Sequence, residues 1–264
     1  MDITMNRSRI LIILVFLIVI SFLLMNSNIF HFMASDNTNN ITNTTNISTI
    51  KVLIFDGNGV MDSSVDGIED CLNDSNNRNL TGNNKFAYNT TDEINSKNLS
   101  GYNVLVMPGG EAPAYLSDSQ IDSSDIKEFV KDGNGYLGIC AGAYAGSNYI
   151  RGDYAGWGLT PDVNTISENY EGLLSISTTS FGSKIINVSP TNLHMDAGPA
   201  MYTNNSQVVI ANFADNHTGY QNYAAIVGDT YGYGRVILSG PHPELPPLNP
   251  QILANMILWC SQKI

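Results

Sequence analysis

Basic residues are scarce in this chain of 264 amino acids, which contains 12 Lys and Arg against 24 Asp and Glu. The formal net charge is −12, and no cluster of basic residues interrupts the acidic character. Phosphate backbones are bound mainly through Lys and Arg, so an acidic surface of this kind repels them. We therefore expect no nucleic-acid partner.

Cysteine is also rare, with Cys71, Cys140 and Cys260 as the three in the chain. Three cysteines are too few for a disulfide scaffold, and an odd number leaves at least one thiol free. For Cys71 and Cys260, which lie on predicted helices, two interpretations stay open. They are small core residues, or they form one disulfide if both helices cover the same face of a sheet.

Charged residues are absent between Arg9 and Asp36, and this interval contains the apolar run ILIILVFLIVISFLLM, Ile10 to Met25. Such a run is either the core of a cleaved signal peptide or part of an uncleaved membrane-spanning helix. No small-residue cleavage site follows it, which favours the anchor. Because Arg7 and Arg9 precede the run, the positive-inside rule places the N-terminus in the cytoplasm and the rest outside.

The chain therefore divides into four predicted parts. They are a cytoplasmic N-terminus (1–9), a transmembrane anchor or signal segment (10–34), a polar flexible stalk (35–49) and a folded domain (50–264). We expect a single-pass cell-membrane protein with its main domain outside, or a secreted protein if the segment is cleaved. Ten Asn-x-Ser/Thr sequons follow the apolar run and predict a glycoprotein, although a chain this rich in Asn, Ser and Thr generates many by chance. They begin at Asn40, Asn43, Asn46, Asn73, Asn79, Asn89, Asn98, Asn187, Asn204 and Asn216.

From residue 50 onward, apolar strand-like segments alternate with helix-like segments. Strands are predicted over 50–59, 103–107, 136–139, 173–179, 184–188 and 208–214, and in a hairpin formed by 224–229 and 234–240. Helices are predicted over 65–73, 123–131 (capped by Ser123 or Ser124), 141–149 and from Asn249 to the end. The alternation predicts an α/β fold with a doubly wound, mostly parallel sheet, helices on both faces and a strand-rich second half.

Cys140 lies in the stretch GICAG, at a predicted strand-to-helix turn. A G-x-C-x-G stretch in this position is the cysteine form of the nucleophile elbow, which presents a thiol at the carboxyl edge of a sheet. The structural alternative is that small residues let the helix pack closely and that Cys140 is a small buried hydrophobe. The stretch alone leaves both interpretations open.

A cysteine nucleophile requires a base, and the chain contains four histidines. His242 lies in SGPHPEL, two residues before Glu244, so an extended backbone projects both side chains to the same side. The flanking prolines restrict this segment, although a solvated proline-rich loop is the alternative. His194, in LHMDAGP with Asp196 two residues on, is the second candidate base.

Together, these motifs resemble the class I glutamine amidotransferase-like superfamily. Its members use a Cys in the elbow, a late H-x-E and a preceding P-G-G turn. The stretches VMPGGEAPAYL, LGICAGAYAGSNYI and GRVILSGPHPEL are most similar to the N-terminal domain family of biotin-protein ligases in its stand-alone form. The resemblance covers about residues 50 to 260 and implies a flavodoxin-like fold. No biotin-ligase catalytic domain is recognisable in the sequence, so we do not carry biotin attachment over.

The resemblance implies a catalytic triad of Cys140, His242 and Glu244, with the backbone N–H groups of Gly110 and Ala141 as the oxyanion hole. It therefore implies an amidohydrolase acting on a small amide or peptide-like substrate, with no cofactor and no metal, and the predicted anchor places this activity outside the cell. The alternative is a non-catalytic cell-surface binding or structural domain that retains the triad scaffold.

Overall fold

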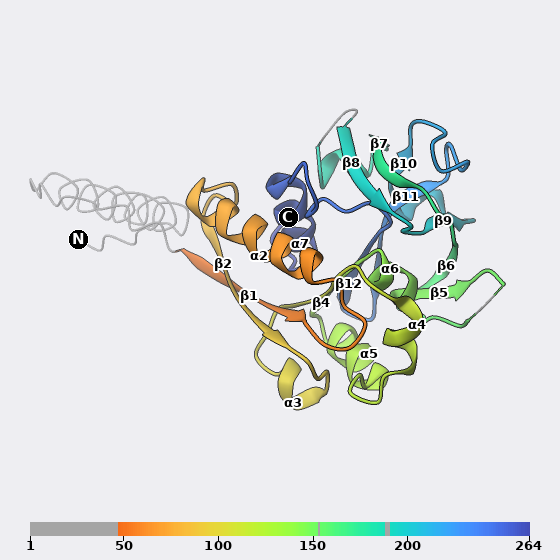
Figure 1. The fold of residues 1–264 in the computed structure, drawn as a ribbon. Coiled ribbons are helices and arrows are strands. Elements are labelled where there is room, and N and C mark those ends of the chain that lie inside the picture. The colour runs from red at the N-terminus through yellow and green to blue at the C-terminus, as the bar shows by residue number, and fades with distance from the viewer. Residues whose placement is uncertain (1–46, 153, 188–190) are drawn as a thin grey trace, which may run out of the picture. The chain divides into compact units, whose positions relative to one another are not determined.

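The computed structural model describes residues 47–152, 154–187 and 191–264 (Figure 1). The predicted anchor (10–34) and most of the predicted stalk lie outside the described residues. Within the described ranges, no helix is both long and apolar enough to cross a membrane.

The described domain combines one large sheet with α-helices. The helices are α2 (Asp62–Asn77), α3 (Ser96–Leu99), α4 (Ala112–Ser117), α5 (Ser123–Lys131), α6 (Ala141–Gly146) and α7 (Pro250–Cys260), with 3₁₀ turns η1 (Gly182–Lys184) and η2 (Ser206–Val208). The strands of the first half are β1 (Ser48–Phe55), β2 (Asn84–Thr91), β3 (Val104–Met107), β4 (Gly135–Ile139) and β5 (Ser147–Ile150). Those of the second half are β6 (Thr160–Ile166), β7 (Glu171–Thr178), β8 (Thr191–Asp196), β9 (Ala200–Thr203), β10 (Val209–Phe213), β11 (Ala224–Tyr231) and β12 (Gly234–Ser239).

The sheet is mixed, with strand order β2-β1-β3-β4-β12-β11-β10-β7-β8. The first five strands of this order are parallel, and every pairing from β12 to β8 is antiparallel. The expectation of a mostly parallel sheet is therefore correct for the first half only. The tight turn between β11 and β12 reverses the chain, and a short hairpin connection requires antiparallel strands.

Helices cover both faces of the parallel half, as continuous apolar strands require. Along β1, Val52 and Ile54 belong to the core cluster under α2 and α7, whereas Leu53 and Phe55 belong to the cluster under α3 to α6. This alternation follows from the period of two residues in a strand. Figure 1 shows α2 and α7 beside each other on one side of the sheet.

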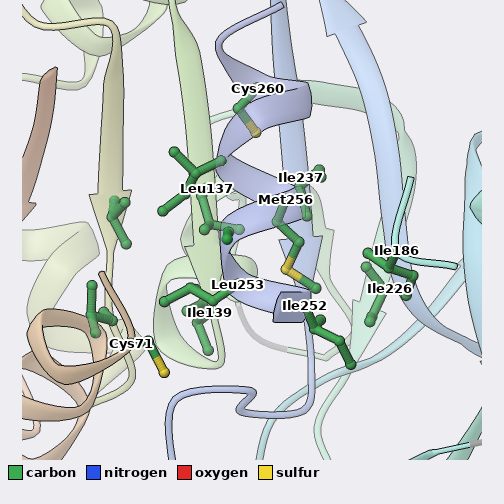
Figure 2. Packing of buried hydrophobic residues seen from close by; sticks show 14 of the residues in the cluster. Cys71, Leu137, Ile139, Ile186, Ile226, Ile237, Ile252, Leu253, Met256 and Cys260 are labelled. Carbon is green, nitrogen blue, oxygen red and sulfur yellow. The ribbon is translucent and has the colours of Figure 1, made fainter. Parts of the chain in front are cut away.

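Cys71 on α2 and Cys260 on α7 are both fully buried in this first cluster. As expected, the two helices pack together, and Ser75 Oγ donates a hydrogen bond to the carbonyl of Pro250 at 3.3 Å. Figure 2 nevertheless shows Cys71 near the N-terminal end of α7 and Cys260 near its last turn. All three cysteines are free thiols, so the disulfide alternative is wrong and both residues are core residues.

Several predicted elements differ from the structure. The strand predicted over 184–188 is wrong, because η1 and a turn occupy its described residues. The 3₁₀ turn begins at Gly182, which packs against β10 so closely that a Cβ there would lie 1.8 Å from the carbonyl oxygen of Ile210. The helix predicted over 141–149 ends at Gly146, and β5 begins at the next residue, Ser147. The N-cap of α5 is Asp122, which accepts from the N–H groups of Ser124 and Asp125, rather than Ser123 or Ser124.

Candidate active site

Cys140 joins the carboxyl end of β4 to the first turn of α6 and has φ 50° and ψ −105°. This positive φ is unusual for a residue with a side chain and marks a strained turn. The two flanking glycines are required by close backbone approach. A Cβ at Gly138 would lie 2.3 Å from the Gly142 carbonyl oxygen, and one at Gly142 would lie 2.1 Å from the carbonyl oxygen of Met107. The G-x-C-x-G spacing therefore has a local steric cause.

His242 and Glu244 follow the carboxyl end of β12, which pairs in parallel with β4. The N–H of Cys140 donates to the carbonyl of Ser239 at 2.8 Å, which joins the two strand ends. Nδ1 of His242 lies 2.7 Å from Oε1 of Glu244, and neither side chain has any exposed surface. The structure thus brings these three predicted residues to one edge of the sheet.

The charge of Glu244 controls the protonation of His242. Burial alone lowers the pKa of His242, but the Glu244 carboxylate outweighs it, and the neighbouring Cys140 sulfur and the hydrogen bond between Nδ1 and Glu244 add to the effect. Together they raise the pKa of His242 to about 10. Nε2 of His242 makes no hydrogen bond of normal geometry with the described residues. The Cys140 thiol instead donates to the main-chain carbonyl of Asp196 at 3.4 Å.

Ser64, on the first turn of α2, is a site residue that the sequence motifs do not contain. Its Oγ donates to Oε1 of Glu244 at 2.7 Å and accepts from the N–H of Gly109 at 2.9 Å. Ser64 is fully buried. Gly67, one turn further along α2, allows this approach, since a Cβ there would lie 2.2 Å from the carbonyl oxygen of Glu244. No sequence signal distinguishes Ser64 from an ordinary serine near a helix start.

The P-G-G turn after β3 packs directly against the histidine. A Cβ at Gly109 would lie 2.5 Å from Cε1 of His242. Gly110 has φ 152°, and a Cβ there would lie 2.1 Å from the carbonyl of Gly59, so both glycines are sterically required. The N–H groups of Gly110 and Ala141 make no hydrogen bond with the part of the chain that the structure describes.

His194, the second candidate base, lies on β8 beside the HPE segment. Its carbonyl accepts from the N–H of His242 at 2.8 Å, and the two rings meet edge-on with centroids 6.4 Å apart. Its Nδ1 lies 3.3 Å from the carbonyl of Pro246. Among the described residues His194 makes no hydrogen bond with Cys140, so it supports the backbone of the HPE segment.

A cleft of about 390 Å³ opens above Cys140. Its lining residues are Met61, Gly110, Glu111, Ala112, Pro113, Cys140, Tyr144, Ile150, Tyr154, Ser167, Glu168, Asp196 and Ala197. In the described ranges, no group of three or more His, Cys, Asp or Glu side chains is arranged to hold a metal ion. Cys140 thus lines a solvent-facing cleft whose other polar side chains are acids, tyrosines and a serine.

The described domain has an α/β fold that several solved structures share. The structure of PurLQS from Thermotoga maritima is similar over 81% of this chain and 98% of that chain, with TM-score 0.56 and 12% identity. A putative thua-like protein from Bacteroides uniformis is similar over 80% and 91%, with TM-score 0.53 and 12% identity. A β-galactosidase from Rahnella sp. R3 matches over 82% of this chain and 31% of its own, with TM-score 0.55 and 12% identity. At this identity the likeness concerns the fold alone.

Sequence comparison gives the family to which the chain is similar. Residues 50–155 match the family described as "Biotin-protein ligase, N terminal". The biotin–protein ligase of Schizosaccharomyces pombe is 30% identical over an alignment of 174 residues that covers 57% of this chain and 27% of that protein. The chain thus spans about a quarter of this relative's length. The predicted resemblance to this family is confirmed, and the predicted likeness to glutamine amidotransferase-like proteins is confirmed for the fold. The family match contains the MPGG and GICAG stretches, whereas the HPE segment lies beyond it.

Proposed function

We propose that this domain is a cysteine-dependent amidohydrolase that acts on a small amide or peptide-like substrate. Cys140 is the nucleophile, His242 the general base and acid, and Glu244 the residue that orients and charges the imidazole. The observation that carries the proposal is the fully buried pair of His242 and Glu244, 2.7 Å apart, beside a thiol held at a strained turn in a cleft. A buried pair of this kind matches the arrangement that cysteine nucleophiles need.

Before acylation, the proton of the Cys140 thiol is transferred to Nε2 of His242, the nitrogen that makes no other hydrogen bond, and leaves a thiolate beside an imidazolium. The thiolate then attacks the substrate carbonyl carbon, and the displaced electron pair forms an oxyanion. The N–H groups of Gly110 and Ala141 stabilise this oxyanion, each donor contributing about 3 kcal/mol. The tetrahedral intermediate collapses, the C–N bond breaks, and the leaving amine takes the proton from His242.

In the second step, His242 takes a proton from water, and the resulting hydroxide attacks the thioester carbonyl. The C–S bond breaks and releases a carboxylic acid, which leaves the Cys140 thiolate beside the protonated His242. The raised pKa of His242 favours an imidazolium between turnovers, which is the charge that stabilises a neighbouring thiolate.

The test is hydrolysis of a panel of small amides, followed by amine release and by intact-mass detection of an acylated protein. We expect turnover that is lost in Cys140→Ser, with an acyl group on Cys140 in the wild type. Cys71→Ser is the matched control, because Cys71 is buried in the core, and it should retain turnover. A wild-type protein that neither turns over nor acylates across the panel would contradict the proposal.

The second candidate is a binding or structural surface domain without catalysis. One observation favours it, namely the bond from the Cys140 thiol to the Asp196 carbonyl, which holds the sulfur on a neutral backbone acceptor. This candidate predicts that Cys140→Ser leaves every measurable property of the domain unchanged except thiol chemistry. The amide panel separates the two candidates.

We also propose that residues 10–34 anchor the protein in the cell membrane, with the domain outside and its exposed sequons available for glycosylation. The support is the uncharged apolar run after Arg7 and Arg9 in the sequence. Full-length protein should remain with membranes after alkaline carbonate washing, with an N-terminus at or near Met1. A mature N-terminus between Ser27 and Thr49 would instead indicate a cleaved signal.

A further inference from the structure

The cleft above Cys140 contains a buried carboxylic acid that the proposed chemistry does not use. Glu168 follows the end of β6 and is 7% exposed. Its Oε2 accepts from the N–H of Tyr170 at 2.7 Å, whereas Oε1 has no hydrogen-bond partner among the described residues. A buried polar atom without a partner is costly, and a ligand that supplies a donor removes that cost.

Burial raises the pKa of Glu168 to about 7, against the opposing hydrogen bond from the Tyr170 N–H, and the nearby Asp196 raises it further. The Tyr144 hydroxyl, which donates to the carbonyl of Ala197 at 3.1 Å, also interacts with Ser167 and Glu168. The carboxyl group is therefore held by its surroundings within the wall of the cleft and has unused capacity to accept a hydrogen bond.

The charges around the cleft decide which donor is favoured. Three carboxylic acids, Glu111, Glu168 and Asp196, line it, and no Lys, Arg or His is among the described lining residues. A cation is therefore attracted by Coulomb interactions, and an anion meets several like charges, since the one nearby cation, His242, is already paired with Glu244. A substrate with a free carboxylate is disfavoured for the same reason.

We propose that the cleft selects amides that carry a protonated primary amine and no free carboxylate, and that Glu168 Oε1 accepts a hydrogen bond from that ammonium group. This inference rests on the proposed function, because it names the substrate class of the same site. An amino-acid amide or the amino-terminal residue of a peptide has this chemistry.

Matched alkylating probes test the proposal without a known substrate. The probes are chloroacetamides that carry a primary amine, a methyl group or a carboxylate at the far end of a linker. Each set of three shares one linker length, and several such sets cover different lengths. Cys140 forms a C–S bond to the methylene carbon of the probe and expels chloride. Peptide mass spectrometry then gives the alkylation rate at each cysteine, for wild type, Glu168→Gln and the control Glu171→Gln, whose side chain is exposed outside the cleft.

We expect the wild type to react with the best amine probe at least about tenfold faster than with its methyl counterpart, since a charge-assisted hydrogen bond contributes at this level. The carboxylate probe should be slowest. Glu168→Gln should reduce the amine preference to about twofold or less, whereas Glu171→Gln should retain it.

Equal rates for the amine and methyl probes at Cys140 of the wild type would overturn the inference and leave the proposed function standing. This comparison needs no variant, so it holds even if Glu168→Gln fails to fold. A preference that survives in folded Glu168→Gln would also overturn it. If no probe labels Cys140 faster than Cys71 and Cys260, the proposed function itself fails.

Discussion

Ser64 Oγ donates a hydrogen bond to Glu244 Oε1 at 2.7 Å, across 180 residues of sequence. The same hydroxyl accepts from the N–H of Gly109. This glycine lies so close to the ring of His242 that an added Cβ would be 2.5 Å from Cε1. One buried serine thus connects the acid of the proposed triad with the turn that holds the imidazole. Such supporting bonds fix the rotamers of site residues, on which precise catalytic geometry depends.

Replacing Ser64 with Ala should slow the reaction of Cys140 with iodoacetamide by about tenfold, because Glu244 loses a charge-assisted donor and Gly109 loses its acceptor. The free energy of unfolding should fall by about 1–3 kcal/mol. Alkylation kinetics by peptide mass spectrometry and urea unfolding measure the two effects.

The matched control is Ser75→Ala. Ser75 is also fully buried on α2, and its Oγ donates to the carbonyls of Cys71 and Pro250, away from the site. It should lose stability to a similar extent but keep the wild-type rate at Cys140. Equal loss of rate in both variants would mean that Ser64 acts through stability alone.

Gly109→Ala should displace His242, because the new methyl would lie 2.5 Å from Cε1 of the ring. We expect the alkylation rate of Cys140 to fall by at least about tenfold, since displacing a catalytic group by about 1 Å can slow a reaction by up to about a hundredfold. In Gly228→Ala the new methyl meets the end of the Ile210 side chain at 2.8 Å, so it controls for overpacking. A Gly109→Ala protein with the wild-type rate would remove His242 from the proposed mechanism.

The pair of His242 and Glu244 should make stability depend on pH. The pKa of His242 is raised to about 10 in the folded protein, above its unfolded value near 6.5. The stabilisation by the protonated ring is therefore fully present below about pH 6.5 and is lost as the pH rises through about 10. Urea unfolding of the wild type and of His242→Gln combined with Glu244→Gln should converge over this interval. A difference that does not change with pH would contradict the assignment of a charged pair.

Glu168 should also make the free energy of unfolding fall as the pH rises, but over a lower pH interval than His242. Its pKa is raised from about 4.5 to about 7, so the stability gained from its neutral form is fully present below pH 4.5 and is lost as the pH rises through 7. The loss is on the order of 2 to 3 kcal/mol. Glu168→Gln should lack this decline in urea unfolding between pH 4.5 and 8. An identical decline in both proteins would show that Glu168 titrates normally.

The elements predicted from sequence are those whose signals are local. The predicted bounds of helix α5 agree with the observed ones. Asn249 is the N-cap of α7, as predicted, and its side chain accepts a hydrogen bond from the N–H of Ile252. Edge strand β2 (NKFAYNTT) escaped prediction because its side chains are mostly polar and it lacks an apolar run. Pairing with β1 in the sheet, a tertiary contact, makes this segment a strand.

The residues of the candidate site likewise divide into those with a local sequence signal and those without one. Cys140, His242 and Glu244 lie in or beside short motifs whose glycines are required by close contacts with neighbouring backbone or side chains. Ser64 and Glu168 have no motif, because Ser64 reaches the site through the packing of α2 at Gly67 and Glu168 through the loop after β6. Such residues become recognisable only when the fold brings distant segments together.

The most direct test of the proposed nucleophile is the iodoacetamide reaction rate of Cys140 near pH 6.5, measured in the wild type, in His242→Gln and in the double variant with Glu244→Gln. The double variant removes both charges, so it avoids leaving a lone buried carboxylate. We predict that wild-type Cys140 reacts about a hundredfold faster than in either variant, while the buried Cys71 and Cys260 stay unlabelled in the folded protein. Equal Cys140 rates in wild type and folded variants would contradict a nucleophile activated by His242 and Glu244.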